Sequence, residues 1–287
     1  MTPTVAPAVA WQVRGGAVPL DRPVVMGVLN VTPDSFSDGD RYVEPALAIE
    51  HALRMVDEGA DVIDVGAEST RPGAAPVEPA EEWARLSGVV EPLAQRGVTV
   101  SIDTMKAEVA ARALGAGAAI VNDVSGLENA PAIGDLCART GAGLVLMHMR
   151  GSPRTMQEDT GYDDLIGEVT RWLEERARRA REAGCAREQI VIDPGIGFGK
   201  STNGNLELLA RTAELTRLGY PVLVGPSRKS FIGKVLGVPV ERRLEGTLAA
   251  CLAAFERGAR IFRVHDVGPA RRALDLADAI RRAGPNG

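Results

Sequence analysis

The sequence has few of the residues that bind zinc or form cross-links. Its three cysteines, Cys137, Cys185 and Cys251, lie far apart and belong to no CxxC pair or Cys/His cluster with metal-binding spacing. Histidine is as scarce, with three residues and no HExxH pattern. These absences exclude a disulfide scaffold and argue against a tight zinc site. We therefore expect reduced cysteines and a cytoplasmic location.

Excess positive charge and long apolar runs are also lacking. The formal net charge is -5, whereas binding nucleic acid requires a basic face, so we expect no nucleic-acid partner. No apolar run approaches the roughly 20 residues of a membrane span, which predicts no membrane association. Residues 1–10 have no charged region typical of a secretory signal and are interrupted by prolines, so we expect a disordered tail.

Several familiar binding and catalytic motifs are incomplete or absent. A phosphate-binding GxxxxGK loop before Lys200 would need a glycine where Pro194 stands, and GxGxxG fails because the glycines of 195–199 alternate. The acidic run at 34–40 has Phe36 at a calcium-ligand position, so it is not an EF-hand. No GxSxG elbow is present. We interpret the 195–199 glycines as a flexible loop between a strand and a helix.

What the sequence does contain is a repeated alternation of strand and helix, typical of a parallel sheet built from βα units. Strands are predicted at 24–30, 61–67, 98–104, 118–124, 143–149, 190–195, 221–227 and 260–266, and helices at 45–60, 80–97, 106–117, 163–184 and 245–259. About eight strands close a (β/α)8 TIM barrel, with a doubly wound open sheet as the alternative. We predict a single domain over 1–287, capped by a short N-terminal β-hairpin at 11–22 that turns at Gly15 and Gly16.

The predicted strands end in polar side chains of both signs, although buried strands rarely end this way. If the barrel closes, these side chains meet at one mouth: Asn30, Asp103, Asn122, His148, Asp193, Ser227 to Ser230, Arg263 and His265. A single aspartate or asparagine at a strand end is more often a loop or helix cap. The recurrence at nearly every strand is what favours a binding site.

The residue types in this set suggest the class of ligand. Asp193 and Asn122 can pair with the amide-like edge of a planar heterocycle. Lys229, Arg263 and His265 suit a phosphate or diphosphate, and Asn30 offers a neutral oxygen to Mg²⁺. The chemistry therefore predicts a group-transfer site for a heterocycle with a phosphorylated arm.

Eight motifs at these strand ends resemble a known family. In chain order they are NVTPDSFSDG, AESTRPG, SIDTMKAEV, VNDVSG, LMHMRG, DPGIGFGK, GPSRKSFIG and RVHDV. This series resembles that of the dihydropteroate synthases over about Met26 to Val267, nearly the whole barrel. The resemblance implies a transferase that joins 7,8-dihydropterin-6-ylmethyl diphosphate to 4-aminobenzoate, giving 7,8-dihydropteroate and diphosphate in folate biosynthesis. It also implies a homodimer that binds only small-molecule substrates.

The resemblance assigns roles to individual residues. For the diphosphate, it implies that Asn30 holds it together with Mg²⁺ and that Arg263 and His265 bind it. For the pterin, it implies a pocket formed by Asp103, Asn122, Asp193 and Lys229, with Met147 and Phe198 near the ring. Thr70 and Ser230 would lie toward the aminobenzoate. Lys229, Arg263, His265 and Asp103 are the expected catalytic residues. The 31–40 and 68–76 loops would close over the site. Ala67 and Asp40 depart from the family pattern, which puts the loop geometry in question rather than the pterin pocket.

The resemblance also suggests a mechanism in which the C–O bond ionises before the amine attacks. Two other functions remain open from the sequence. One is a methyltetrahydrofolate-binding methyltransferase domain, which has no use for the diphosphate contacts of the SRKS loop and the RVH pair. The other is a pterin-binding paralogue without activity, which would lose loop residues that are nearly complete here.

Overall fold

A computed structural model of the chain describes residues 10–31, 43–68 and 76–284. Within these ranges, eight parallel strands are hydrogen bonded in the order β8-β7-β6-β5-β4-β3-β10-β9. They are β3 (Val24–Asn30), β4 (Val62–Gly66), β5 (Val100–Asp103), β6 (Ile120–Asp123), β7 (Gly143–Met147), β8 (Ile190–Asp193), β9 (Leu223–Val224) and β10 (Ile261–Val264). A bridge between Ile192 and Val222 joins the two ends of this order. The predicted (β/α)8 barrel is confirmed, and the doubly wound alternative is wrong.

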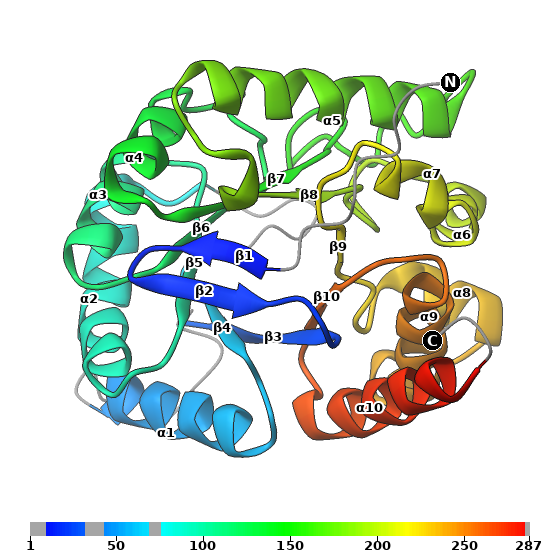
Figure 1. Ribbon diagram of the computed structural model, residues 1–287, viewed down its shortest axis with the longest axis horizontal. Helices are drawn as coiled ribbons and strands as arrows, with labels where there is room; N and C mark the ends of the chain where they lie inside the picture. Colours follow the sequence, from blue (N-terminus) through cyan, green and yellow to red (C-terminus); the bar gives the residue numbers. More distant parts are fainter. Residues whose placement is uncertain (1–9, 32–42, 69–75, 285–287) are drawn as a thin grey trace.

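Helices surround the strands (Figure 1). In the described residues they are α1 (Val43–Asp57), α2 (Pro79–Gln95), α3 (Ala107–Gly115), α4 (Ala132–Thr140), α5 (Leu165–Glu182), α6 (Thr202–Ala210), α7 (Thr212–Thr216), α8 (Ser230–Leu236), α9 (Leu244–Phe255) and α10 (Val267–Ala283), with 3-10 turns η1 (Arg187–Gln189) and η2 (Val240–Arg242). None of these helices is both long enough and apolar enough to cross a membrane.

The helix α5 illustrates how the sequence specifies these elements. The Asp164 side chain caps its first turn by accepting a hydrogen bond from the Gly167 N–H at 3.0 Å. Val169 and Leu173, four residues apart, are buried on the face that packs against the barrel. Gly184 follows the helix with a positive φ of 99°, which favours glycine.

The N-terminal hairpin closes the barrel at the starts of the strands. It consists of β1 (Ala10–Val13) and β2 (Gly16–Pro19), and it crosses the middle of the ring in Figure 1. Trp11 is fully buried among residues from the first halves of the barrel strands, and its Nε1 donates to the Gln189 carbonyl at 2.8 Å. The hairpin is confirmed, although the predicted turn is shifted by one residue, because Gly16 pairs with Val13 and the turn is Arg14–Gly15.

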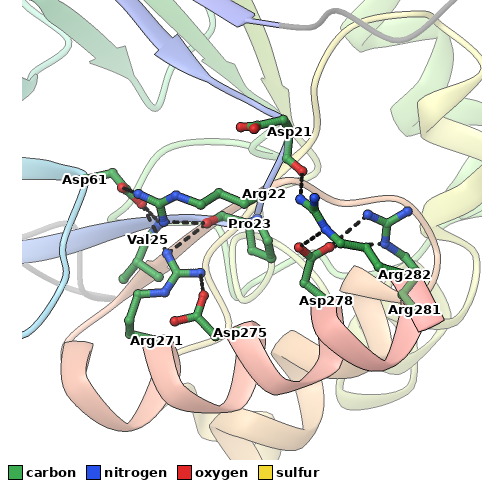
Figure 2. Close-up of polar contacts among 10 residues, drawn as sticks. All are labelled: Asp21, Arg22, Pro23, Val25, Asp61, Arg271, Asp275, Asp278, Arg281 and Arg282. Atoms are coloured by element: carbon green, nitrogen blue, oxygen red, sulfur yellow. Dashed lines mark hydrogen bonds and ion pairs between the residues drawn. The ribbon is translucent and has the colours of Figure 1, made fainter. Parts of the chain in front are cut away.

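An ion-pair network fixes the same end of the barrel from outside (Figure 2). Arg271 of α10 donates to the Pro23 carbonyl at 2.8 Å and to Asp61 at 3.3 Å. Asp61 in turn accepts from the Val25 N–H at 2.8 Å and pairs with Arg22. Because the N-terminal face of such barrels serves stability rather than catalysis, we assign this network to folding and expect the active site at the opposite, C-terminal end.

Candidate active site

A guanidinium joins two carboxylates at the C-terminal end of the barrel. Arg263 of β10 donates from Nε to Asp64 Oδ2 at 2.6 Å and from Nη2 to Asp103 Oδ2 at 2.9 Å. Asp64 lies on β4 and Asp103 on β5, so the arginine reaches past β3 to the two strands beyond it. Burial alone lowers the pKa of Arg263, but the charges of Asp64 and Asp103 raise it overall. This arginine therefore remains charged.

Asp64 is a central site residue that the sequence reasoning missed. It is fully buried, and besides Arg263 it accepts a hydrogen bond from Asn122 Nδ2 at 3.0 Å. The predicted site residues lie at strand ends, whereas Asp64 is the third residue of β4. The available signal was a carboxylate in the middle of the apolar run VIDVG, because an unpaired charge is rarely buried in a strand. Asn122, which was predicted, uses its N–H donor on Asp64 and keeps its carbonyl for another partner.

Two carboxyl groups of the mouth have raised pKa values. Burial raises the pKa of Asp103 to about 7, with Asp64 adding to the shift and Arg263 opposing it. Burial also raises the pKa of Asp193 to about 6, against the hydrogen bond from Gly195 and the charges of Lys200, Lys229 and Arg263. Charge is concentrated here in a poorly solvated space, which is typical of functional sites.

The loop after β8 passes very close to its neighbours. Gly195 N–H donates to Asp193 Oδ1 at 2.7 Å. A Cβ on Gly195 would lie 1.9 Å from the His148 carbonyl oxygen, and one on Gly197 would lie 2.9 Å from Lys229 Cδ. Both glycines have positive φ. The interpretation of 195–199 as a loop between a strand and a helix is confirmed, and its glycines are needed for close packing and positive φ.

The two apolar side chains predicted near the pterin ring, Met147 and Phe198, pack together at this loop. Met147 and Phe198 are buried in one small apolar cluster with Val124, Met149 and Met156. Lys229 Nζ lies 4.0 Å from the centroid of the Phe198 ring, within cation–π range. The cluster supplies an apolar wall beside the charged groups, as a flat heterocycle requires.

His265 lies beside Arg263, just after the end of β10. Its ring Nδ1 is 3.0 Å from Ser227 Oγ, and its backbone N–H donates to the same oxygen at 3.2 Å. Burial lowers its pKa to about 4, and the charges of Arg263 and Arg228 contribute. Because a buried ring beside a guanidinium stays neutral at pH 7, His265 offers a phosphate a hydrogen bond rather than a positive charge.

The remaining predicted residues lie at the rim or outside the described residues. Asn30 is exposed at the end of β3, level with Gly66 of β4, and Ser230 is exposed at the first turn of α8. Thr70, Asp40 and most of the 31–40 and 68–76 loops fall outside the described residues. At the base of the second loop, Lys106 pairs with Glu68 and with Glu82 of α2, which is fully buried.

The rim of the barrel mouth offers a metal ion mainly neutral oxygen ligands. The described parts of the chain contain no group of three or more His, Cys, Asp or Glu side chains arranged to hold a metal ion. Mg²⁺ commonly keeps several waters and binds through substrate phosphates, so it needs few protein ligands. The exposed amide oxygen of Asn30 at the barrel mouth fits such a site.

Comparisons with known proteins agree with this geometry. The family model described as "Pterin binding enzyme" matches residues 26–265. Dihydropteroate synthase of Escherichia coli (strain K12) is 47% identical over 274 residues, covering 95% of this chain and 97% of that protein. The crystal structure of Yersinia pestis dihydropteroate synthase with a sulfonamide drug complex has a TM-score of 0.89 at 44% identity, covering 95% of this chain and 99% of that one. The Thermus thermophilus enzyme in complex with 4-aminobenzoate has a TM-score of 0.86 at 46% identity, covering 94% and 99%.

The chain is thus an enzyme of the pterin-binding family, built on a (β/α)8 barrel with its polar site at the C-terminal mouth. Within that family it belongs to the dihydropteroate synthases, transferases that condense a dihydropterin diphosphate with 4-aminobenzoate in folate synthesis. The resemblance predicted from the eight motifs is confirmed, and neither the methyltransferase nor the inactive paralogue is favoured.

Proposed function

We propose that the barrel mouth condenses 7,8-dihydropterin-6-ylmethyl diphosphate with 4-aminobenzoate through the residues described above. The observation that carries this assignment is the convergence of Arg263, Asp64, Asp103 and Asp193 from four strands into one poorly solvated space. Turnover of the two substrates to 7,8-dihydropteroate and diphosphate by the purified chain is the direct test. Absence of product with both substrates present would remove the assignment.

Asp193 and Asn122 form the ring-binding part of the site in this proposal. The Asp193 carboxylate accepts N–H groups from the heterocycle, while the Gly195 N–H keeps it oriented. The free carbonyl of Asn122 accepts another. Met147 and Phe198 cover the apolar face of the ring, and Lys229 lies over Phe198 where it can donate to a ring oxygen or nitrogen.

The diphosphate lies toward Arg263, His265 and Asn30. Arg263 supplies fixed positive charge to the departing oxygen, and the neutral His265 supplies a hydrogen-bond donor. Mg²⁺, held by Asn30 and the diphosphate, would neutralise further negative charge on the leaving group. Ser230 is assigned to the aminobenzoate, and so is Thr70, which lies outside the described residues. The aminobenzoate carboxylate can accept a hydrogen bond from the hydroxyl of Ser230, which is exposed at the rim.

The reaction proceeds by ionisation followed by capture. The C–O bond to the exocyclic methylene breaks and its electron pair leaves with the diphosphate. The dihydropterin delocalises the resulting positive charge, and the carboxylates of Asp64, Asp103 and Asp193 favour that charge electrostatically. The amine nitrogen of 4-aminobenzoate then forms the new C–N bond and releases a proton to solvent, so no strong general base is needed.

Labelled diphosphate is expected to exchange into the dihydropterin substrate when 4-aminobenzoate is omitted. The reason is that ionisation precedes amine attack, so the cation can be recaptured by a labelled diphosphate bound at the same site. Incorporation of label is measured by chromatography of the recovered substrate. Exchange that depends strictly on the amine would instead indicate direct displacement.

Pterin affinity is expected to depend on pH through Asp193. Its carboxylate is the accepting form and is present above its pKa of about 6. Affinity should therefore be constant above about pH 7 and fall by about tenfold per pH unit below pH 6, since one proton must be displaced. Calorimetry with a dihydropterin that lacks the diphosphate avoids titration of the phosphates. The Asp193→Asn variant should lose this acidic limb, and retention of the limb would assign it to another group, such as Asp103.

The domain organisation, the oligomeric state and the cellular location are also proposals. We infer one domain over 1–287, because the hairpin, strands and helices share contacts from the first barrel strand to the last. A homodimer is supported by apolar side chains exposed on α8 and α10, including Leu236 and Ile280, and sedimentation velocity tests it. A cytoplasmic location fits three buried, unbridged cysteines.

A further inference from the structure

Lys200, which the proposed function does not use, is a buried lysine without a carboxylate at ion-pair distance among the described residues. Only 3% of it is exposed. Its Nζ donates to Phe198 O at 2.8 Å and to His148 O at 3.0 Å, and it lies 2.9 Å from His148 Nδ1. An ammonium has three N–H donors, and three acceptors surround this one. His148 Nδ1 is thus an acceptor, and the ring proton is on Nε2.

The burial of this group is unfavourable and so calls for a role. Burial lowers the pKa of Lys200 to about 7, although the charge of Asp193 opposes the shift and that of Lys229 adds to it. Burial likewise lowers the pKa of His148 to about 2, which keeps the imidazole neutral and able to accept. Lysine is almost never fully buried unless it is paired, and here backbone carbonyls provide most of the pairing. A lysine held in this way is suited to fixing backbone positions.

The three bonds connect the two loops that form the ring-binding wall. His148 directly follows β7 and Met147, while Phe198 and Lys200 lie in the loop after β8. The backbone N–H of His148 also donates to the Asp193 carbonyl at 2.9 Å, so the two loops are joined at the end of β8 as well. Phe198 in turn contacts Lys229 at 4.0 Å. Movement of the Phe198 carbonyl would therefore displace the Phe198 ring relative to Asp193 and to Lys229, which is held at the N-terminus of α8.

We propose that Lys200 is a positioning residue for the pterin substrate, acting by clamping the 195–200 loop to His148. It rests on the proposed function, because the wall it fixes is the one assigned to the heterocycle. Lys200 does not touch the reacting atoms, and it acts through Phe198 and Asp193. Its loss should weaken binding of the pterin and leave the aminobenzoate side of the site unchanged, since Ser230 lies on α8 beyond the clamp.

The Lys200→Met variant tests this role, because methionine retains most of the volume and removes all three donors. The KM for dihydropterin diphosphate is expected to rise about tenfold or more, while the KM for 4-aminobenzoate and kcat at saturation change less than about threefold. Lys234→Met is the matched control, since Lys234 is exposed on α8, and it should leave all three constants unchanged. Equal pterin KM values in wild type and Lys200→Met, or equal rises for both substrates, would overturn the proposal.

A pair of His148 variants provides a second test if Lys200→Met fails to fold. His148→Gln keeps an acceptor for the ammonium, whereas His148→Leu removes it and leaves the two carbonyls. We expect the pterin KM to rise for His148→Leu and to be largely restored in His148→Gln. Indistinguishable constants for the two variants would contradict the clamp. Wild-type turnover measured first separates this outcome from failure of the proposed function, because an inactive wild type refutes the function itself.

Discussion

Replacement of Arg263 by glutamine is expected to reduce kcat/KM for the pterin substrate by about two to three orders of magnitude, the usual effect of removing one preorganised donor from a developing anion. Arg263 is the cation that the structure holds between Asp64 and Asp103, with 21% of its side chain exposed. Without it the leaving diphosphate meets two carboxylates that have lost their counter-charge. Steady-state kinetics with both substrates measures the change.

The same substitution at Arg271 separates chemistry from stability. Arg271 likewise pairs with two carboxylates, Asp61 and Asp275, but it is buried at the N-terminal end of the barrel. Breaking a buried pair costs about 3–5 kcal/mol of unfolding free energy, so both variants should unfold at lower urea concentration. Only Arg263→Gln should lose kcat/KM. Equal losses of kcat/KM in the two folded variants would show that the effect of Arg263 is structural.

Lysine should not restore activity at position 263. The guanidinium donates from Nε to one carboxylate and from Nη2 to the other, so two nitrogens along one edge of a rigid planar group bind two different partners. An ammonium is a single point donor and cannot span both partners in the same way. Recovery of wild-type kcat/KM in Arg263→Lys would indicate that charge alone, without the bridge between Asp64 and Asp103, is sufficient.

The barrel was predictable because its strands are short Val- and Ile-rich runs bounded by glycines and polar residues. All eight predicted ranges contain a strand, and 24–30 matches β3 at both ends. Helices α4, α6, α7, α8 and α10 were not predicted individually. Four of them have only five to nine residues, which makes a repeating apolar pattern hard to tell from a loop. The fifth, α10, has 17 residues and was missed although its buried positions repeat along one face. Their positions follow from the closed barrel rather than from local sequence.

Site residues at strand ends were predictable from the sequence. Site residues inside helices or strands, and charge states set by burial, were not. Asp103, Asn122 and Asp193 lie at or next to their strand ends, so their position in the chain identifies them. Asp64 and Glu82 are inside regular elements and become part of the mouth only through tertiary packing. The neutral state of His265 depends in the same way on neighbours brought together by folding. Residue type and spacing carry no information on the charge of His265, and the only sequence signal for Asp64 is a carboxylate within an apolar strand.

Replacement of Asp193 by asparagine is expected to weaken pterin binding by about 2–4 kcal/mol, or about 30- to 1,000-fold in Kd. Asparagine keeps an oxygen for the Gly195 N–H, now 2.7 Å from Asp193 Oδ1, so the loop can stay in place. Its amide nitrogen then presents an N–H where the heterocycle also presents an N–H. A buried donor left without an acceptor carries its full desolvation penalty. Calorimetry with a dihydropterin ligand measures the loss.

Asp123→Asn is the matched control for this substitution. Asp123 is fully buried at the end of β6, as Asp193 is largely buried at the end of β8. Its carboxylate accepts from Ser125 and Leu127 N–H groups at 2.8 and 2.7 Å, all within its own turn. This variant should lose stability while its Kd for the pterin stays within about threefold of wild type, because no ligand contact is removed. Wild-type affinity in Asp193→Asn would exclude Asp193 from the pocket, since the carboxylate is the acceptor on which ring recognition depends.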